Sequence, residues 1–234
     1  MSHIHLHPQK IKLPISELKS LTAGVENSRH GALFPNNIRA LICGPSGSGK
    51  TNLLFSLLTH PNGIRFKNIY IVSKSLEQEK YKLLRNIFAK VTGLKSFFLD
   101  FTEDLPTPDQ CLPNSVVIID DVLCLKADKD KIRGFFCFGR HKNIDIFYLY
   151  QTYTHIDKHL LRDNCNLIIL FSQDFTNLKH VYDDHLIGDV TFEDFTNICR
   201  ICWRERFGFV AIIKENDINN GKIRKGIDNF ISIS

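Results

Sequence analysis

The sequence contains no run of about 20 apolar residues, the length that a membrane-spanning helix requires. Charge of one sign does not dominate either: 30 Lys and Arg stand against 25 Asp and Glu, a formal net charge of +5. This mild surplus is compatible with a polyanionic partner but does not indicate one. The first ten residues, MSHIHLHPQK, also lack the apolar run of a signal peptide. We therefore expect no membrane span and no secretion.

The seven cysteines do not suggest a disulfide scaffold. Their number is odd, and several of them, such as Cys43, Cys124 and Cys137, lie inside apolar runs. Buried free thiols in a reducing compartment fit this distribution better than extracellular cross-links. We expect the protein to be intracellular.

Apolar runs with strand character alternate with segments of helical spacing, which is typical of an α/β fold with parallel crossover units. With 234 residues, of which 43% are apolar, the chain is long enough for one such domain. We predict an N-terminal arm over residues 1–36, the domain over 37–214 and a peripheral tail over 215–234. The predicted strands cover 37–43, 68–72, 96–99, 115–121, 144–150, 166–171 and 207–213, and the predicted helices cover 50–58, 76–91, 128–138, 156–163, 174–186 and 191–202.

A glycine-rich loop between the first strand and the first helix matches the phosphate-binding pattern G-x-x-x-x-G-K-T. Its glycines let successive backbone N–H groups point at one phosphate, and the helix that follows adds its positive end. The lysine would reach the β- and γ-phosphates, and the threonine hydroxyl would hold Mg²⁺. We predict an ATP site formed by Gly44, Pro45, Ser46, Gly47, Ser48, Gly49, Lys50 and Thr51.

The predicted strand 115–121 ends in two acids, Asp120 and Asp121. An enzyme with a phosphate-binding loop needs a carboxylate at the end of a neighbouring strand to fix Mg²⁺. Asp120 would hold the metal, and Asp121 would orient or deprotonate the attacking water. Alternatively, both acids are solvated side chains in a turn. Their position after the glycine-rich loop favours the metal site and hydrolysis.

The next strand, IDIFYLY, ends at Gln151, and a basic turn containing Arg140 precedes it. The strand predicted over 68–72 lies between the loop strand and the acid strand in the sequence. This spacing suits a RecA-like (ASCE) core, in which the sensor strand lies between the other two in the sheet. Gln151 would then contact the γ-phosphate or the attacking water, although an amide that caps a turn is the alternative. Arg140 would lie far from its own nucleotide and could face that of a neighbour in a ring. A solvated basic turn is nearly as compatible with the spacing.

Together these segments resemble the FtsK–HerA superfamily of ring ATPases, which pump DNA. The likeness is greatest to the genome-packaging ATPases of virophages and Polinton/Maverick elements, which are related to the poxvirus packaging ATPase. It rests on GPSGSGKTNLL, VVIIDDV and GRHKNIDIFYLYQTY followed by IDKHLLRDNCNLIILF, and it continues through HVYDDHLIGDVTFEDFTNIC and CWRERFGFVAI. It therefore covers roughly residues 35–214, and the GRH…Q…RDN run separates this group from kinases and GTPases.

The resemblance implies ATP and Mg²⁺ as ligands and a fold with a mostly parallel sheet covered by helices on both faces. It also implies a homo-oligomeric ring, pentamer or hexamer, that moves double-stranded DNA into a preformed capsid inside an infected cell. The protein would then be found in a viral factory, the nucleus or the virion. Carried over to this sequence, the functional residues are Lys50 and Thr51 for phosphate and Mg²⁺, Asp120 for the metal, Asp121 for hydrolysis, Gln151 as sensor and Arg140 as arginine finger. Many superfamily members have Glu where this chain has Asp121.

Two other classes of function stay open from the residues. One is a cellular type of phosphate-loop protein that remodels nucleoprotein without pumping, and the other is a small-molecule kinase. A zinc site made by Cys199, Cys202, His180 and His185 is a further hypothesis, but the two cysteines also fit one apolar helix face, and we expect core packing.

Overall fold

The β-branched and aromatic runs form the strands of one sheet, whose central members are buried on both faces. The computed structural model describes residues 29–101, 104–120 and 126–232. Within them the strands are β1 (Arg39–Cys43), β2 (Asn68–Ser73), β3 (Lys95–Leu99), β4 (Ser115–Asp120), β5 (Asp145–Tyr150), β6 (Leu167–Leu170), β7 (Val210–Ile213), β8 (Ile223–Lys225) and β9 (Asn229–Phe230).

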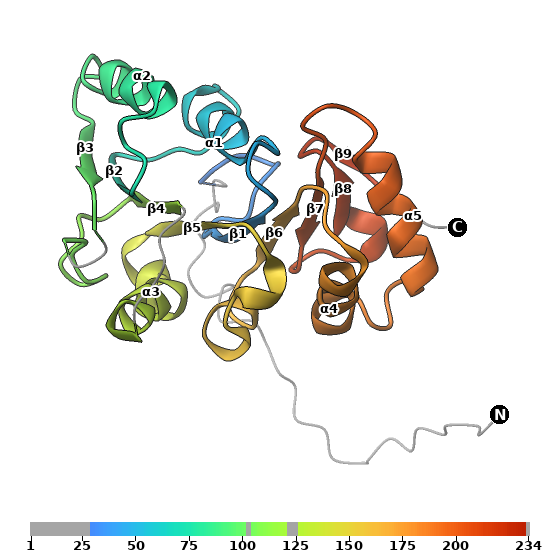
Figure 1. Ribbon diagram of the computed structural model, residues 1–234. Coiled ribbons are helices and arrows are strands. Elements are labelled where there is room, and N and C mark those ends of the chain that lie inside the picture. Colours follow the sequence, from blue (N-terminus) through green and yellow to red (C-terminus); the bar gives the residue numbers. More distant parts are fainter. Residues whose placement is uncertain (1–28, 102–103, 121–125, 233–234) are drawn as a thin grey trace, which may run out of the picture.

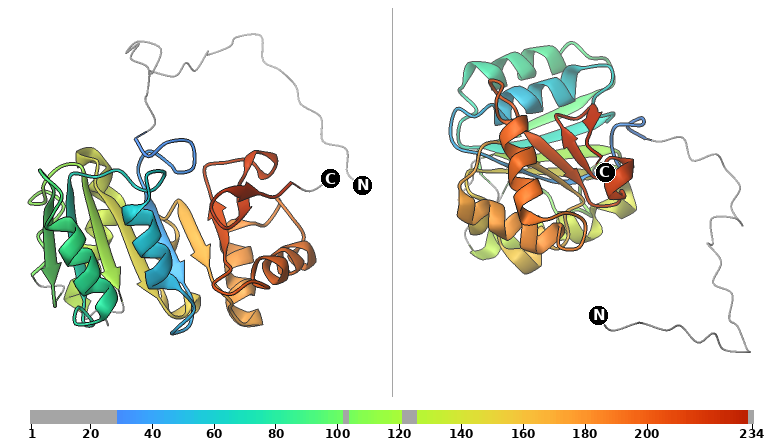
Figure 2. Two further views of the ribbon diagram at one scale, coloured as in Figure 1. Left: turned by 90° about the horizontal axis from the view of Figure 1, so that it is seen from above. Right: turned by 90° about the vertical axis from the view of Figure 1, so that its right-hand side faces the viewer.

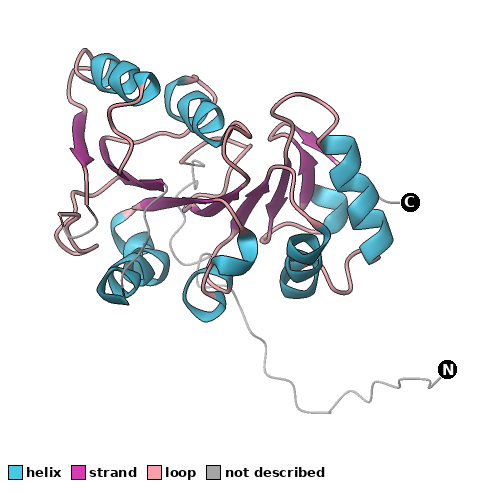
Figure 3. Ribbon diagram, in the orientation of Figure 1, coloured by secondary structure: helices cyan, strands magenta, loops and turns pink. Residues whose placement is uncertain are grey.

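Helices cover both faces of this sheet (Figures 1 and 3). The α-helices are α1 (Lys50–Thr59), α2 (Glu79–Phe88), α3 (Lys126–Phe138), α4 (Phe175–His185) and α5 (Phe192–Cys202). Short helical turns are η2 (Gly139–Lys142), η3 (Tyr153–His155), η4 (Lys158–Arg162) and η5 (Ile218–Asn220). In the described part of the chain, no helix is long and apolar enough to cross a bilayer.

The strand order is β3-β2-β4-β5-β1-β6-β7-β8-β9, and the six strands from β3 to β6 run parallel. The predicted order is confirmed: β5 lies between β1 and β4, with Cys43 opposite Tyr150 and Asp120 opposite Leu149. Parallel strands end at one edge of a sheet, so the loops that follow β1, β4 and β5 meet there. In the left view of Figure 2 the strand arrows point to this edge.

Two apolar cores flank the sheet, one on each face. Leu54, Leu84 and Phe88 of α1 and α2 pack against one face. The other face is covered by α3, α4 and α5, whose buried side chains include Phe135 and Phe195. The two-sided burial explains why the central strands read as continuous apolar runs instead of alternating ones.

The predicted helix 76–91 begins three residues later, at Glu79. A local turn precedes it, in which the Ser73 hydroxyl accepts a hydrogen bond from Ser75 N at 3.1 Å. Such side-chain hydrogen bonds compete with the start of a helix. The turn places Ser75 and Gln78 at the carboxyl edge of the sheet, where both line a cavity.

The predicted helix 156–163 is a π-helical turn, η4. Its backbone N–H groups bond five residues back, with Arg162 N to Asp157 O at 3.2 Å and Asp163 N to Lys158 O at 2.9 Å. Residues 215–234, predicted as a peripheral tail, supply β8 and β9 to the edge of the sheet. Ile223 pairs with Ile212 and is fully buried, so this segment takes part in the core.

The described end of the N-terminal arm is tied to the start of β5. The fully buried carboxylate of Asp145 accepts a hydrogen bond from Ile38 N at 2.7 Å and forms an ion pair with Arg29 at 3.0 Å. Removing one member of a buried ion pair typically costs about 3–5 kcal/mol, because the remaining charge stays buried. Residues 1–28 of the predicted arm lie outside the described residues.

Candidate nucleotide-binding site

The glycine-rich loop connects the buried end of β1 to the first turn of α1, as the sequence predicts. Gly47 and Gly49 have φ angles of 75° and 112°, a left-handed region that other residues rarely adopt. A Cβ atom on Gly44 would lie 2.6 Å from Ser48 Oγ and 2.7 Å from Phe171 Cβ, so a side chain does not fit there. The first turn of α1 carries no acidic residue and no side-chain cap. Its N–H groups therefore remain suited to an anion.

Lys50 is the first residue of α1, and its side chain reaches back to the start of this loop. Its ammonium donates hydrogen bonds to the carbonyl oxygens of Gly44 and, at 3.0 Å, of Pro45. The hydroxyl oxygen of Ser48 is buried and has no hydrogen-bond partner among the described residues. Buried polar atoms normally have a hydrogen-bond partner, so the unpartnered Ser48 hydroxyl fits a loop that wraps around a polar ligand.

The acid and the predicted sensor converge on the same place from two strands. Asp120 ends β4, is 7% exposed, and accepts a hydrogen bond from the Tyr81 hydroxyl of α2. Gln151 follows β5, and its backbone carbonyl oxygen accepts a hydrogen bond from Gln173 Nε2 at 3.4 Å. A cavity of about 340 Å³ is lined by Lys50, Thr51, Asp120 and Gln151, together with Ser46, Gly47 and Gly49 of the loop.

The chemistry of this cavity fits a magnesium–nucleotide ligand. A hydroxyl and a carboxylate, from Thr51 and Asp120, are oxygen ligands of the kind that Mg²⁺ takes. Lys50 and the loop N–H groups supply the positive side that phosphates require. Gly44, Pro45 and Ser48 shape the loop but do not line the cavity.

Sequence reasoning missed two groups of cavity residues. Ser75 and Gln78 come from the segment between β2 and α2, and Lys80 comes from the first turn of α2. Arg206 and Phe207 come from the loop between α5 and β7. The CWRERFGF segment carries a visible cluster of Arg, Phe and Gly between a helix and a strand. No local pattern in the sequence marks the other group.

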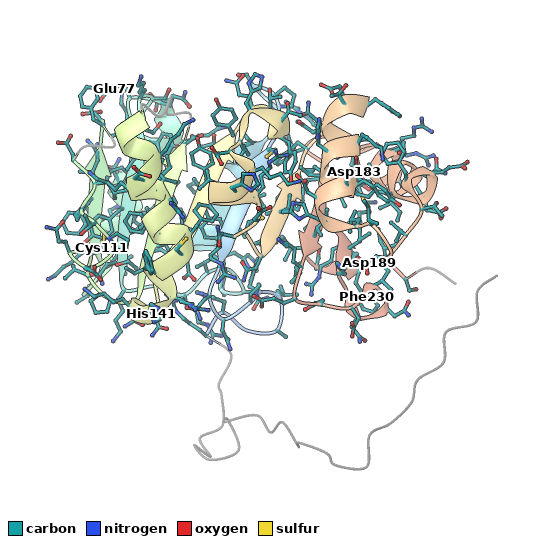
Figure 4. The ribbon with its side chains drawn as sticks, turned by 90° about the horizontal axis from the view of Figure 1, so that it is seen from below. Glu77, Cys111, His141, Asp183, Asp189 and Phe230 are labelled. Carbon is teal, nitrogen blue, oxygen red and sulfur yellow. The ribbon has the colours of Figure 1, made fainter. Side chains whose placement is uncertain are left out.

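Arg140 lies outside this cavity, as the sequence predicts. It belongs to η2, before β5, whereas Gln151 follows the other end of that strand. Arg140 is exposed and lines a separate hollow of about 390 Å³, together with Arg39, Asp163 and Lys214. Figure 4 shows His141, its neighbour in the chain, at the end of the molecule opposite to Glu77, which lies in the loop after β2.

Asp121 lies outside the described residues, so its predicted role stays a prediction. The thiols of Cys199 and Cys202 are fully buried in the core face of α5, as the packing interpretation expects. Burial raises the pKa of Cys202 to about 11. His185 contacts Tyr153, and no group of three or more His, Cys, Asp or Glu in the described residues is arranged to hold a metal ion.

The chain has the α/β fold of P-loop NTPases. Among solved structures it is similar to the genome packaging NTPase B204 from Sulfolobus turreted icosahedral virus 2 in complex with sulfate. The TM-score is 0.53 at 15% identity, over 84% of this chain and 98% of B204. For B204 in complex with ATP-γS the TM-score is 0.52 at 15% identity, over 83% and 98%.

B204 from Sulfolobus turreted icosahedral virus, a DNA-packaging ATPase, is similar with a TM-score of 0.50 at 15% identity, over 83% of this chain and 97% of that one. At identities this low, the structural similarity shows a shared fold and nothing more. No protein-family model matches the sequence, and no curated protein matches it either.

Proposed function

We propose that the chain is an ATPase of the FtsK–HerA type that translocates double-stranded DNA and packages a viral or virus-like genome into a preformed capsid. The observation that carries the proposal is the convergence of four side chains on one cavity, from the first turn of α1 after β1 and from the ends of β4 and β5: Lys50, Thr51, Asp120 and Gln151. The fold shared with packaging NTPases supports the same proposal.

Each residue has a role that its position supports. Lys50 would exchange the carbonyl oxygens of Gly44 and Pro45 for phosphate oxygens of ATP. Thr51 and Asp120 would hold Mg²⁺, which neutralises charge that develops on the phosphates. Gln151 would orient the attacking water, and Asp121 would accept its proton.

A ring of subunits is part of the proposal, because Arg140 lies at the wrong end of β5 to reach its own cavity. The six residues of β5 span about 20 Å at the usual rise per residue. In a ring, Arg140 would face the nucleotide of an adjacent subunit and stabilise charge on its γ-phosphate. We expect the DNA contacts to be local to the pore, because a net charge of +5 is too mild to favour a polyanion over the whole surface.

The test measures phosphate release with and without double-stranded DNA of two unrelated sequences, over a range of salt. Turnover should rise equally with both DNAs, because a motor grips the backbone without reading bases. The stimulation should fall steeply with salt, because phosphate contacts release counterions. Lys50→Ala is the inactive control. Turnover that ignores DNA while the ring is assembled, or a phosphorylated small acceptor instead of free phosphate, would contradict the proposal.

A further inference from the structure

The loop between α5 and β7, residues 203–209, lies directly against the glycine-rich loop. A Cβ atom on Gly49 would come within 2.9 Å of Phe207 Cδ1 and within 3.1 Å of two more atoms of that side chain. Phe207 itself has a φ angle of 64°, which is rare for a bulky residue. Strain of this kind persists only where the surroundings hold it, and it concentrates at functional sites.

Three anchors hold this loop in place. Trp203 Nε1 donates a hydrogen bond to Leu170 O, the last residue of β6, at 3.0 Å. Glu205 forms an ion pair with Lys225 of β8 at 2.6 Å. Gly208 N donates to Glu205 O at 2.9 Å, in a turn so tight that a Cβ on Gly208 would lie 2.1 Å from Cys202 O. The position of Phe207 is therefore set by β6 and β8 as well as by its own loop.

Phe207 and its neighbour Arg206 lie between two hollows. The Arg206 guanidinium stands 4.8 Å from the centre of the Phe207 ring, and both residues line the nucleotide cavity. Both also line a second hollow of about 350 Å³, which continues to Asp228, in the turn before β9, and to Asn229, the first residue of β9. Phe207 is 40% exposed, so part of its ring is open to a ligand.

The strand order determines which way a bound nucleotide would be oriented. Asp120 ends β4 and Gln151 follows β5, both on one side of β1, whereas loop 203–209 precedes β7, on the other side. Hydrolysis requires the terminal phosphate beside the acid and the sensor. The nucleoside end must then leave the glycine-rich loop on the side of Arg206 and Phe207.

We propose that Phe207, Arg206 and the hollow beyond them form a subsite for the nucleoside, that is, for the ribose and base of the triphosphate. An aromatic ring beside a guanidinium is suited to the flat face of a base. The Asp228 carboxylate can accept hydrogen bonds from ribose hydroxyls, and the Asn229 amide can both donate to and accept from a base edge. This proposal rests on the proposed ATPase function, since it assumes that the γ-phosphate faces Asp120.

The experiment compares two ligands of the full-length protein, Mg·ATP and inorganic tripolyphosphate, which lacks the nucleoside. Phe207→Gly removes the ring and suits the positive φ angle, so the loop keeps its backbone path. Stacking of a base on an aromatic side chain is worth enough to change affinity on the order of tenfold. We expect Phe207→Gly and Arg206→Ala to weaken ATP binding by about that factor and to leave tripolyphosphate binding within about twofold.

Arg204→Ala is the matched control, because Arg204 is an exposed arginine of the same loop that lines neither hollow. Asp228→Ala is a further variant, at an exposed position in the second hollow. It should also weaken ATP binding without weakening tripolyphosphate binding. Equal losses for both ligands would show that loop 203–209 only shapes the phosphate site, and unchanged ATP affinity would show that there is no nucleoside subsite. Either result overturns the proposal.

Failure here is distinct from failure of the proposed function. If the glycine-rich loop binds phosphates, Lys50→Ala should weaken the binding of both ligands, independently of the role of Phe207. No DNA is present in these binding measurements, so they do not depend on translocation. A protein that hydrolyses ATP without responding to DNA could still show the nucleoside subsite.

Discussion

The position of Tyr81 is explained by its hydrogen bond to Asp120. Its ring is buried in the core under α2, and its hydroxyl donates a hydrogen bond to the Asp120 carboxylate. Hydrogen bonds to charged groups contribute about 1.5–3 kcal/mol, and one that bridges α2 and β4 also orients the carboxylate. Tyr81 therefore positions the proposed metal ligand from outside the contiguous motifs.

We expect Tyr81→Phe to raise the Mg²⁺ concentration that half-maximal ATP hydrolysis requires, on the order of tenfold, because Asp120 loses the bond that orients it. High Mg²⁺ should restore most of the turnover. Steady-state rates in a Mg²⁺ titration measure this, with Tyr70→Phe as control for the loss of a hydroxyl elsewhere in the sheet. An unchanged Mg²⁺ dependence would reduce Tyr81 to a packing residue.

Asp184, in α4, organises a polar cluster that joins three elements, because its partners come from η3 and η4. Its carboxylate forms ion pairs with Lys158 and Arg162, both at 2.8 Å, and accepts a hydrogen bond from the Tyr153 hydroxyl at 3.0 Å. That hydroxyl also lies 2.7 Å from His185 Nε2. The cluster fixes the connection between β5 and β6, which begins at Gln151, to α4.

This cluster predicts a pH dependence of stability. Burial, with nearby Lys214, lowers the pKa of His185 to about 4, against about 6.5 in an unfolded chain. The unfolded state therefore takes up a proton first, and the free energy of unfolding should fall as the pH drops from about 6.5 to about 4. The expected loss from this group is on the order of 2–3 kcal/mol over that range.

Urea unfolding at pH 7 and pH 5 tests this expectation. His185→Gln keeps a polar side chain at the position but cannot titrate, so its stability should vary less with pH than that of the natural chain. His141→Gln, at an exposed position far from the cluster, serves as control. If natural and His185→Gln chains lose the same free energy of unfolding between the two pH values, other groups set the pH dependence.

At the scale of the whole molecule, Arg140 is the residue on which the proposed ring can be tested. Its hollow lies at the amino edge of the sheet, away from the nucleotide cavity of its own subunit. If Arg140 acts on the nucleotide of an adjacent subunit, as proposed, Arg140→Ala should keep nucleotide binding and lose about 10³–10⁵ in turnover, the range for arginines supplied by a neighbour. Mixed with Lys50→Ala subunits, which are inactive for a different reason, it should regain part of the activity.

The recovery arises because some interfaces of a mixed ring pair an intact glycine-rich loop with an intact Arg140. ATP turnover over a range of mixing ratios measures it, and light scattering verifies that mixed rings have formed. A flat, inactive series in verified mixed rings would mean that Arg140 acts within its own subunit or only folds the turn before β5.

Features that depend on contiguous residues follow from the sequence alone. The glycine-rich loop needs a strand, a set of backbone turns and a helix in immediate succession, and all three are written in residues 39–59. Asp120 and Gln151 are visible because each ends an apolar run, and parallel strands end at one edge. The order of β1, β4 and β5 is that of the RecA-like core that the sequence predicts, and the described residues confirm it.

Only the tertiary structure decides which distant side chains complete these motifs. Tyr81 reaches Asp120 across 39 residues because α2 packs on the face of the sheet whose core also includes β4 side chains, and no local pattern encodes that contact. Phe207 meets Gly49 because β6 and β7 bring the loop after α5 back to the carboxyl edge of the sheet. Such contacts depend on how helices and strands pack in three dimensions, whereas a motif depends on spacing along the chain.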